Sequence, residues 1–143
     1  MRITESKGFN ISLTPEELKE VGSIEKINKA FSFDNVLSFD IFNDDILVGF
    51  AQLREYDKSC YFLWHFGIDN RYQNKGVGTK VLIELIDYLK INYNLKEMTT
   101  TYLFGNEHAK HIYETVGFIE TEIINEGDVH EVNMIYKLDE ERV

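Results

Sequence analysis

The sequence is short of several residue types, and each shortage excludes a class of protein. Its one cysteine, Cys60, allows neither an intrachain disulfide nor a thiolate metal cluster, which fits a reducing compartment. No apolar run approaches the roughly 18 residues that a membrane-spanning helix needs. Residues 1–10 carry charge and lack the apolar block of a signal peptide. We therefore expect a cytoplasmic protein with no membrane partner.

Positive charge is also scarce, with 15 basic residues against 25 acidic ones and a net charge of −10. An acidic surface repels nucleic acid and attracts cations, so we expect no nucleic-acid partner. The same charge also explains solubility alone, and the sequence does not separate the two explanations. The 143 residues suit one domain, 1–143, with its own hydrophobic core, because neither a repeat nor a linker divides them.

The spacing of apolar residues predicts alternating strands and helices. Thr14, Pro15 and Glu17 mark a helix start, in which Thr14 is the N-cap and Glu17 completes a capping box. Further helices are expected from Ser23 to about Phe31, over 76–93, and over 107–116. Strands are expected over 11–13, 35–42, 46–54, 60–68, 98–103, 118–124 and 129–138. This order predicts an α/β fold, with a sheet of mixed direction and helices on its faces.

Two of the nine glycines stand close together in the stretch RYQNKGVGTK, residues 71–80, between a predicted strand and a predicted helix. The first amides of a helix have no internal partner and attract anions, and glycine lets an anion come close to them. One residue separates Gly76 from Gly78, so this is not a P-loop, and Val81 replaces the third glycine of a dinucleotide fingerprint. Taken alone, the pair fits a tight turn as well as an anion site.

A second pattern, Asn106-x-x-Ala109-x-x-x-Tyr113-x-x-x-Gly117-Phe118, decides between these alternatives. Together with Gln73-x-x-Gly76-x-Gly78, it resembles the paired signatures of GNAT-superfamily N-acetyltransferases. The resemblance implies the GNAT fold, in which a mixed sheet of about six or seven strands is flanked by about four helices. It also implies acetyl-CoA as the cosubstrate. Asn74 stands where the family often has glycine, and Asn can take the required positive φ.

The resemblance also implies where acetyl-CoA binds. The backbone of the strand that ends near Ile68 would pair with the pantetheine arm, and the amides that open the following helix would hold the pyrophosphate. Tyr113 would give a proton to the departing thiolate, although packing on the sheet is an alternative role. The cofactor-binding residues implied in this way are Phe66, Ile68, Gln73, Asn74, Lys75, Gly76, Val77, Gly78, Thr79, Asn106, Ala109 and Tyr113.

Within the family, FLWHFGIDNRYQNKGVG followed by NEHAKHIYETVGF is most similar to the bacterial spermine/spermidine (diamine) acetyltransferases. A polyamine or diamine is therefore the expected acceptor, and an alkyl amine with a pKa of about 10.4 must lose a proton before it attacks. His65 is the candidate base, with Glu55, Asp40 or a water chain as alternatives. Glu55, Tyr61 and Trp64 are the candidate acceptor contacts. Further carboxylates expected on the acceptor side are Asp34, Asp40, Asp44, Asp45 and Asp57.

Two other functions stay open. The acceptor could be a protein Lys or N-terminus, or the chain could be a non-catalytic acetyl-CoA-binding regulatory module. His108 and His111 have the spacing of a metal pair, but no third ligand is evident nearby, so we expect surface histidines and no metal. The C-terminal hairpin often helps to form dimers in the resembled family, which makes a homodimer one expected assembly.

Overall fold

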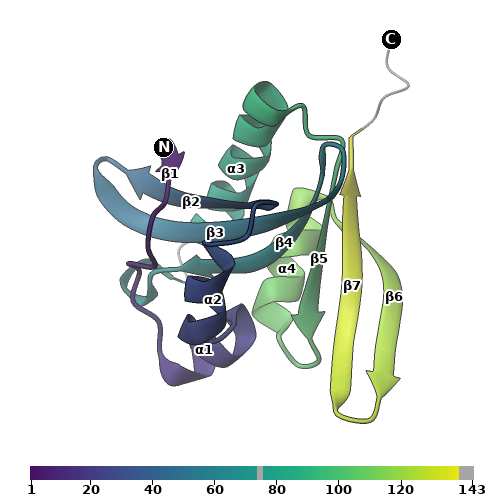
Figure 1. Cartoon of the computed structure of the whole chain (residues 1–143). Coiled ribbons are helices and arrows are strands. Elements are labelled where there is room, and N and C mark those ends of the chain that lie inside the picture. The colour runs from purple at the N-terminus through teal and green to yellow at the C-terminus, as the bar shows by residue number, and fades with distance from the viewer. Residues whose placement is uncertain (74–75, 139–143) are drawn as a thin grey trace.

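The computed structural model describes residues 1–73 and 76–138 (Figure 1). The helices are α1 (Pro15–Val21), α2 (Ile24–Ala30), α3 (Val77–Tyr93) and α4 (Glu107–Val116), with a 3₁₀ turn, η1 (Asn70–Tyr72). The strands are β1 (Arg2–Glu5), β2 (Val36–Asn43), β3 (Ile46–Asp57), β4 (Cys60–Ile68), β5 (Glu97–Leu103), β6 (Ile119–Glu126) and β7 (Val129–Lys137). They form one sheet in the order β1-β2-β3-β4-β5-β7-β6. Every neighbouring pair in it is antiparallel except β4 and β5. The mixed α/β class expected from the sequence is confirmed.

One expected strand, 11–13, is wrong. Residues 2–5 form the first strand instead, paired with β2. Ser12 is held by groups outside the sheet ladder: its N–H donates to the Asp69 carboxylate at 2.9 Å, and its carbonyl accepts from the Asn70 N–H at 2.8 Å. Ile11 is buried against Ile27 on α2. Ile11 and Leu13 are apolar because they pack in the hydrophobic cluster around Ile27, and not because they belong to a strand.

The helices cover both faces of the sheet (Figure 1). α3 and α4 pack on one face over the main core, to which α3 contributes a fully buried stripe of Val81, Leu82, Leu85, Ile86 and Leu89. α1 and α2 lie on the other face over a smaller cluster around Phe50. Within the described residues, no helix is both long and apolar enough to span a bilayer.

A bulge in β4 decides which face of the sheet each of its side chains takes. Gln52 of β3 pairs with His65, but the next residue of β3, Leu53, pairs with Leu63, so Trp64 is the extra residue. The bulge shifts the two-residue alternation of side chains: Leu63 and Ile68 both lie in the main core, whereas His65 faces α1 and α2.

The parallel pairing of β4 with β5 also stops early. It covers Cys60, Tyr61 and Phe62 on β4 against Glu97, Met98 and Thr99 on β5. Beyond Phe62 the two strands separate within the sheet. A cavity lies at this opening between the neighbouring strands.

Candidate active site

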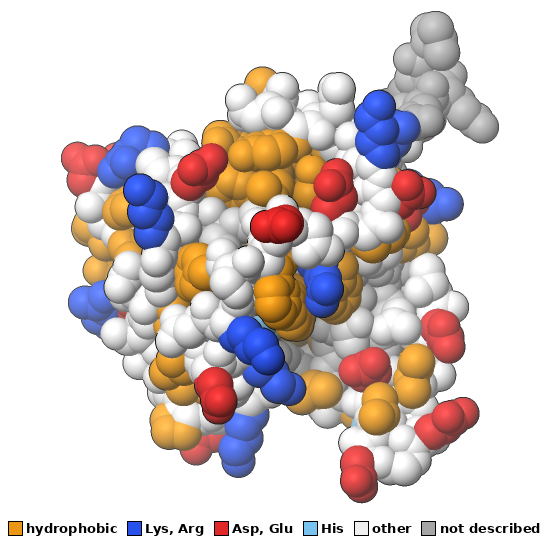
Figure 2. Space-filling model, in the orientation of Figure 1, with side chains coloured by type: hydrophobic (Ala, Val, Ile, Leu, Met, Phe, Trp, Pro, Cys, Tyr) orange, Lys and Arg blue, Asp and Glu red, His pale blue; other side chains and the backbone are white. Residues whose placement is uncertain are grey.

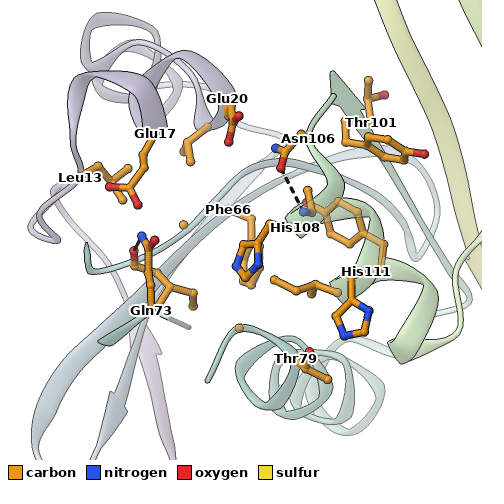
Figure 3. Close-up of a pocket in the computed structure, with 18 of the residues that line it drawn as sticks. Leu13, Glu17, Glu20, Phe66, Gln73, Thr79, Thr101, Asn106, His108 and His111 are labelled. Atoms are coloured by element: carbon orange, nitrogen blue, oxygen red, sulfur yellow. Dashed lines mark hydrogen bonds between the residues drawn. The ribbon is translucent and has the colours of Figure 1, made fainter. Parts of the chain in front are cut away.

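A cavity of about 380 Å³ lies between the separated ends of β4 and β5. α1 borders it on one side, and α4 and the first turn of α3 border it on the other (Figure 3). Its wall includes nine residues expected from the sequence to bind the cofactor: Phe66, Ile68, Gln73, Gly76, Gly78, Thr79, Asn106, Ala109 and Tyr113. Segments more than thirty residues apart in the chain therefore meet at one place.

The remaining expected residues are not in this wall. Val77 packs partly buried against the main core, and Asn74 and Lys75 lie outside the described residues. His65, Glu55, Tyr61 and Trp64 also lie away from the cavity. The wall instead contains residues not expected from the sequence to belong to a site, among them Leu13, Glu17, Glu20, Val21, Thr101, His108 and His111.

The two glycines at the start of α3 have different roles. Gly76 is the N-cap, in the left-handed region with φ 73°, and a Cβ there would meet nothing within 4 Å. Gly78 lies against α4, where a Cβ would stand 2.8 Å from Cδ1 of Ile112. Gly76 thus provides an open, positively polarised helix end at the cavity, and Gly78 allows α3 and α4 to pack closely beside it.

Side-chain bonds hold the turn that leads into α3. Asp69 is fully buried and accepts hydrogen bonds from the backbone N–H groups of Ser12 and Arg71 and from the Arg71 guanidinium at 2.9 Å. The Arg71 side chain is the largest influence, and it keeps the pKa of the Asp69 carboxyl well below its usual range. The Gln73 amide donates to the Ile68 carbonyl at 2.7 Å, so this side chain ties the turn to the end of β4.

α4 carries the second group of cavity residues. Asn106 caps the helix by accepting from the Ala109 N–H at 3.1 Å (Figure 3). Tyr113, one turn further on, is 7% exposed, and its ring lies 5.4 Å from that of Phe118. Burial raises the pKa of Tyr113, and a hydrogen bond with Thr100 opposes that rise. The phenol therefore keeps its proton at neutral pH and can act as a donor.

His65 faces the junction of α1 and α2. Gln52 donates through Nε2 to the Ile27 carbonyl at 3.1 Å, so its Oε1 is free to accept from Nδ1 of His65 at 2.7 Å. A Cβ on Gly22 would stand 2.5 Å from Cδ2 of His65. Burial lowers the pKa of His65 to about 4, and Lys26 adds to this effect. The bulge at Trp64 places this ring on the face of the sheet that α1 and α2 cover, and His65 is not among the residues that line the cavity.

The residues expected to contact the acceptor do not meet at the cavity. Tyr61 is buried in the main core, and the Trp64 ring stacks on Phe33 with centroids 6.2 Å apart. Glu55 accepts from the Ser59 N–H at the far end of β3. None of the acidic residues expected on the acceptor side, Asp34, Asp40, Asp44, Asp45, Glu55 and Asp57, lines the cavity. On the face of the molecule that Figure 2 shows, acidic side chains are spread singly instead of gathered in one patch.

The carboxylates that do reach the cavity come from α1. Glu17 and Glu20 lie three residues apart on the helix and so share a face. Figure 3 shows them on the side of the cavity opposite His108 and His111. In the sequence, Glu17 reads only as a capping residue, a role it also has through its 2.7 Å bond from the Thr14 N–H. No group of three possible metal ligands occurs in the described part of the chain, 1–73 and 76–138.

Comparison with known proteins gives the class. Residues 8–118 match the acetyltransferase (GNAT) family, and the chain belongs to that family. The GNAT resemblance inferred from the paired motifs is thereby confirmed.

Individual proteins of this family are also similar to the chain. A spermine/spermidine N(1)-acetyltransferase of Bacillus subtilis (strain 168) is 39% identical over 79 residues, which are 50% of this chain and 52% of that protein. The chain thus matches about half the length of this curated relative. An Elizabethkingia anophelis GNAT acetyltransferase with acetyl-CoA bound has a TM-score of 0.69 at 18% identity, covering 95% of this chain and 98% of that one. A spermidine N-acetyltransferase from Vibrio cholerae has a TM-score of 0.66 at 21% identity, covering 85% and 74%. These two structures support the fold alone.

Proposed function

We propose that the protein transfers the acetyl group of acetyl-CoA to a primary amine, and that the preferred acceptor is a polyamine. One observation carries the proposal: the open N-terminus of α3, the free edge of β4 and the Tyr113 side chain all border a single cavity. An anion site, an extended backbone edge and a proton donor are the three features that the donor thioester and its transfer require.

The donor would lie along β4 and reach α3. Beyond Phe62, β4 has lost its pairing with β5, so the backbone of Phe66 and Ile68 can bond an extended amide chain such as pantetheine. The amides of residues 76–79 open a helix of 17 residues, whose dipole favours a pyrophosphate at this end. Gly76 leaves room there, since a Cβ would meet nothing within 4 Å. Asn74 and Lys75 belong to the same proposed loop but lie outside the described residues.

The chemistry is a direct transfer. The neutral amine nitrogen attacks the thioester carbonyl, a C–N bond forms, and the C–S bond breaks. Tyr113 gives its phenol proton to the sulfur, and the amine's proton leaves through water. We assign the donor role to Tyr113 because its raised pKa keeps the phenol protonated at neutral pH. We assign no step to His65, because its ring is buried at the junction of α1 and α2.

The acceptor follows from charge and from similarity. Glu17 and Glu20 give the α1 side of the cavity two carboxylates, which suit the spaced ammonium groups of a polyamine better than a single amine. The Bacillus subtilis relative, matched over half its length, is a spermine/spermidine acetyltransferase. Both observations favour a flexible polycation over a protein Lys or N-terminus.

The test measures CoA release with spermine, spermidine, short diamines, aminoglycosides, amino acids and peptides with free N-termini, next to calorimetric binding of CoA. We expect turnover with polyamines to exceed turnover with every peptide by at least tenfold in kcat/KM. A peptide preference would overturn the acceptor assignment and favour a protein acetyltransferase. CoA binding without release for any amine would overturn the enzyme assignment and favour a regulatory acetyl-CoA-binding module.

A further inference from the structure

We propose that His65 is a positioning residue for α1: its ring stops the end of that helix at Gly22, fixes Glu20 at the cavity, and so sets the preference for acceptors with more than one ammonium group. The inference rests on the acetyl transfer proposed above, and it assigns a role to a buried histidine that the transfer itself does not use. His65 is 2% exposed and is not among the residues that line the cavity, so its influence on the acceptor passes through the helix that it contacts.

α1 depends on outside contacts for its position. It has seven residues, none of them buried, and an isolated helix of this length does not persist in water. Its first turn is closed by the capping box, in which Glu17 accepts from the Thr14 N–H at 2.7 Å. Its last turn is closed by the Gly22 N–H, which donates to the Leu18 carbonyl at 2.8 Å. Glu20 lies in this last turn, so the contacts around Gly22 decide where its carboxylate stands.

Two residues of β4 carry the end of α1. A Cβ on Gly67 would stand 3.4 Å from Cγ2 of Val21, so the helix lies directly on the strand at this point. Two residues earlier, on the same face of β4, the ring of His65 meets Gly22. A Cβ on that glycine would stand 2.5 Å from Cδ2 and 2.8 Å from Nε2 of the ring. The end of α1 therefore cannot come closer to β4, because even one added carbon atom would overlap the ring.

The ring of His65 is itself held by the sheet and by α2. Gln52 on β3 accepts from Nδ1 of the ring at 2.7 Å and donates to the Ile27 carbonyl of α2 at 3.1 Å. All three residues are buried, and Ile27 packs in a hydrophobic cluster with Phe50. A close-packed ring whose rotation is fixed by a hydrogen bond does not turn aside for Gly22. α2, which is anchored by its buried residues, thus determines through Gln52 and His65 where α1 ends.

The position of Glu20 matters for acceptors that carry more than one charge. In the proposed transfer one amine nitrogen reaches the thioester, and an ammonium group further along the acceptor meets Glu20 on the α1 side of the cavity (Figure 3). A charge-assisted hydrogen bond of this kind requires a short distance between its two groups. A monoamine has no second ammonium group, so its transfer does not depend on where α1 ends. The ratio of kcat/KM for spermidine to that for butylamine therefore reports the position of α1.

Gly22→Ala tests the contact from the helix side. The added Cβ must push α1 away from the ring, and we expect the spermidine-to-butylamine ratio of kcat/KM to fall about five- to tenfold. The KM for acetyl-CoA should stay within about twofold of the parent's, because neither Gly22 nor His65 lines the cavity. Gly127→Ala, in the turn between β6 and β7, is the matched control. It also places alanine at a positive φ, 56° against 133° at Gly22, but its Cβ would meet nothing within 4 Å.

The decisive measurement is a double-mutant cycle with His65→Ala, which removes the ring but not the positive φ at position 22. In that background Gly22→Ala should lower the ratio by less than about twofold, because the backbone strain remains and the overlap is gone. Equal losses in both backgrounds would overturn the inference. An equal loss in Gly127→Ala, or equal losses of kcat/KM for the two amines, would also overturn it. If His65→Ala does not fold by circular dichroism, His65→Asn, which keeps an N–H for Gln52 and lacks Nε2, takes its place.

The parent protein separates this inference from the proposed function. Turnover of spermidine by the parent tests the proposed function before any variant is made. A parent that shows no preference for spermidine over butylamine would overturn both the polyamine acceptor and the role of His65. A parent that shows this preference, with no coupling between Gly22→Ala and His65→Ala, would overturn the role of His65 alone.

Discussion

Gly78 of α3 touches α4 at Ile112, so closely that a Cβ at position 78 would stand 2.8 Å from Cδ1 of that isoleucine. Ile112 is 7% exposed and lines the cavity. The second glycine of the motif is thus required by the packing of two helices, and this packing shapes the cavity wall between them.

Gly78→Ala should therefore weaken CoA binding more than it weakens the fold. The added methyl group must push the end of Ile112 towards the cavity, whereas alanine within a helix is about 1 kcal/mol more favourable than glycine. We expect the Kd for CoA, measured by calorimetry, to rise about tenfold, with an unfolding free energy within about 1 kcal/mol of the parent's.

Gly76→Ala is the matched comparison, and it should weaken the fold more than it weakens CoA binding. Its Cβ has open space, but φ at 73° is unfavourable for alanine by about 1–2 kcal/mol. Gly76→Asn should recover part of that loss, because Asn tolerates this conformation. Equal Kd values for the parent and Gly78→Ala would contradict the packing explanation.

Glu20→Gln should raise the KM for polyamines by a few-fold to about tenfold, with little change in kcat or in the KM for acetyl-CoA. The carboxylate lies on the α1 side of the cavity, so its loss removes attraction for an ammonium group without touching Tyr113. Steady-state kinetics with spermidine measure the effect. Glu16→Gln on the same helix is the control, because Glu16 is exposed and is not among the residues that line the cavity. Equal KM changes in the two variants would indicate general charge and not a specific contact.

His65 should make the fold sensitive to acid. Its pKa is near 4 in the folded protein and about 6.5 in an unfolded chain, so the unfolded state binds the extra proton between these values. Its contribution is fully present above about pH 6.5 and is lost as the pH falls towards 4, by about 3 kcal/mol in total. Urea unfolding at pH 7.5, 5.5 and 4.5 measures this slope.

The His65→Gln variant isolates the contribution of the histidine, because every other titrating group is common to both proteins. We expect the variant to lose less stability than the parent over the same pH range. Parallel slopes for parent and variant would show that the ring takes up a proton as readily folded as unfolded. A pH–rate profile whose acid limb disappears in the variant would revive His65 as the base.

Asp69→Asn should lower the unfolding free energy by about 2–3 kcal/mol, because it leaves the buried end of a charged network with too few acceptors. The carboxyl pKa is depressed in the folded state, so this stabilisation is present above the ordinary value of about 3.8 and is lost as the pH falls below it. Urea unfolding near pH 7 measures the difference.

Arg71→Gln should cost less than Asp69→Asn, since Asp69 then keeps its bonds from the backbone N–H groups of Ser12 and Arg71. The Arg71 side chain is also 64% exposed, where water screens the pair. If both variants lost the same stability, the backbone bonds would contribute nothing measurable.

Much of the molecule follows from local sequence. The capping box of α1 and the Ser23 cap of α2 lie where their residue types predict, because a short hydroxyl side chain satisfies the same orphan amides in any protein. The stripe of α3 was likewise readable from its three- and four-residue spacing. The paired motifs around Gly76 and Tyr113 led to the correct family because they record local backbone requirements at fixed spacing.

Local sequence does not predict which face of the sheet each side chain of a central strand takes. Residues 60–68 form a nearly continuous apolar run, and such a run gives no alternation from which to assign faces. The bulge at Trp64 arises from pairing with β3, and it decides that Leu63 lies in the main core while His65 meets Gly22.

The sequence by itself determined most of the elements, the helix caps and the family, because these depend on residues near one another in the chain. Tertiary structure alone decided which carboxylates reach the cavity. Glu17 and Glu20 line it because α1 packs on the face of the sheet opposite α3 and α4, whereas Asp44 and Asp45 lie in the turn between β2 and β3 and are not among the residues that line it. Pairing over long separations set the β4 bulge and the early end of the β4–β5 ladder, and no local pattern encodes such contacts.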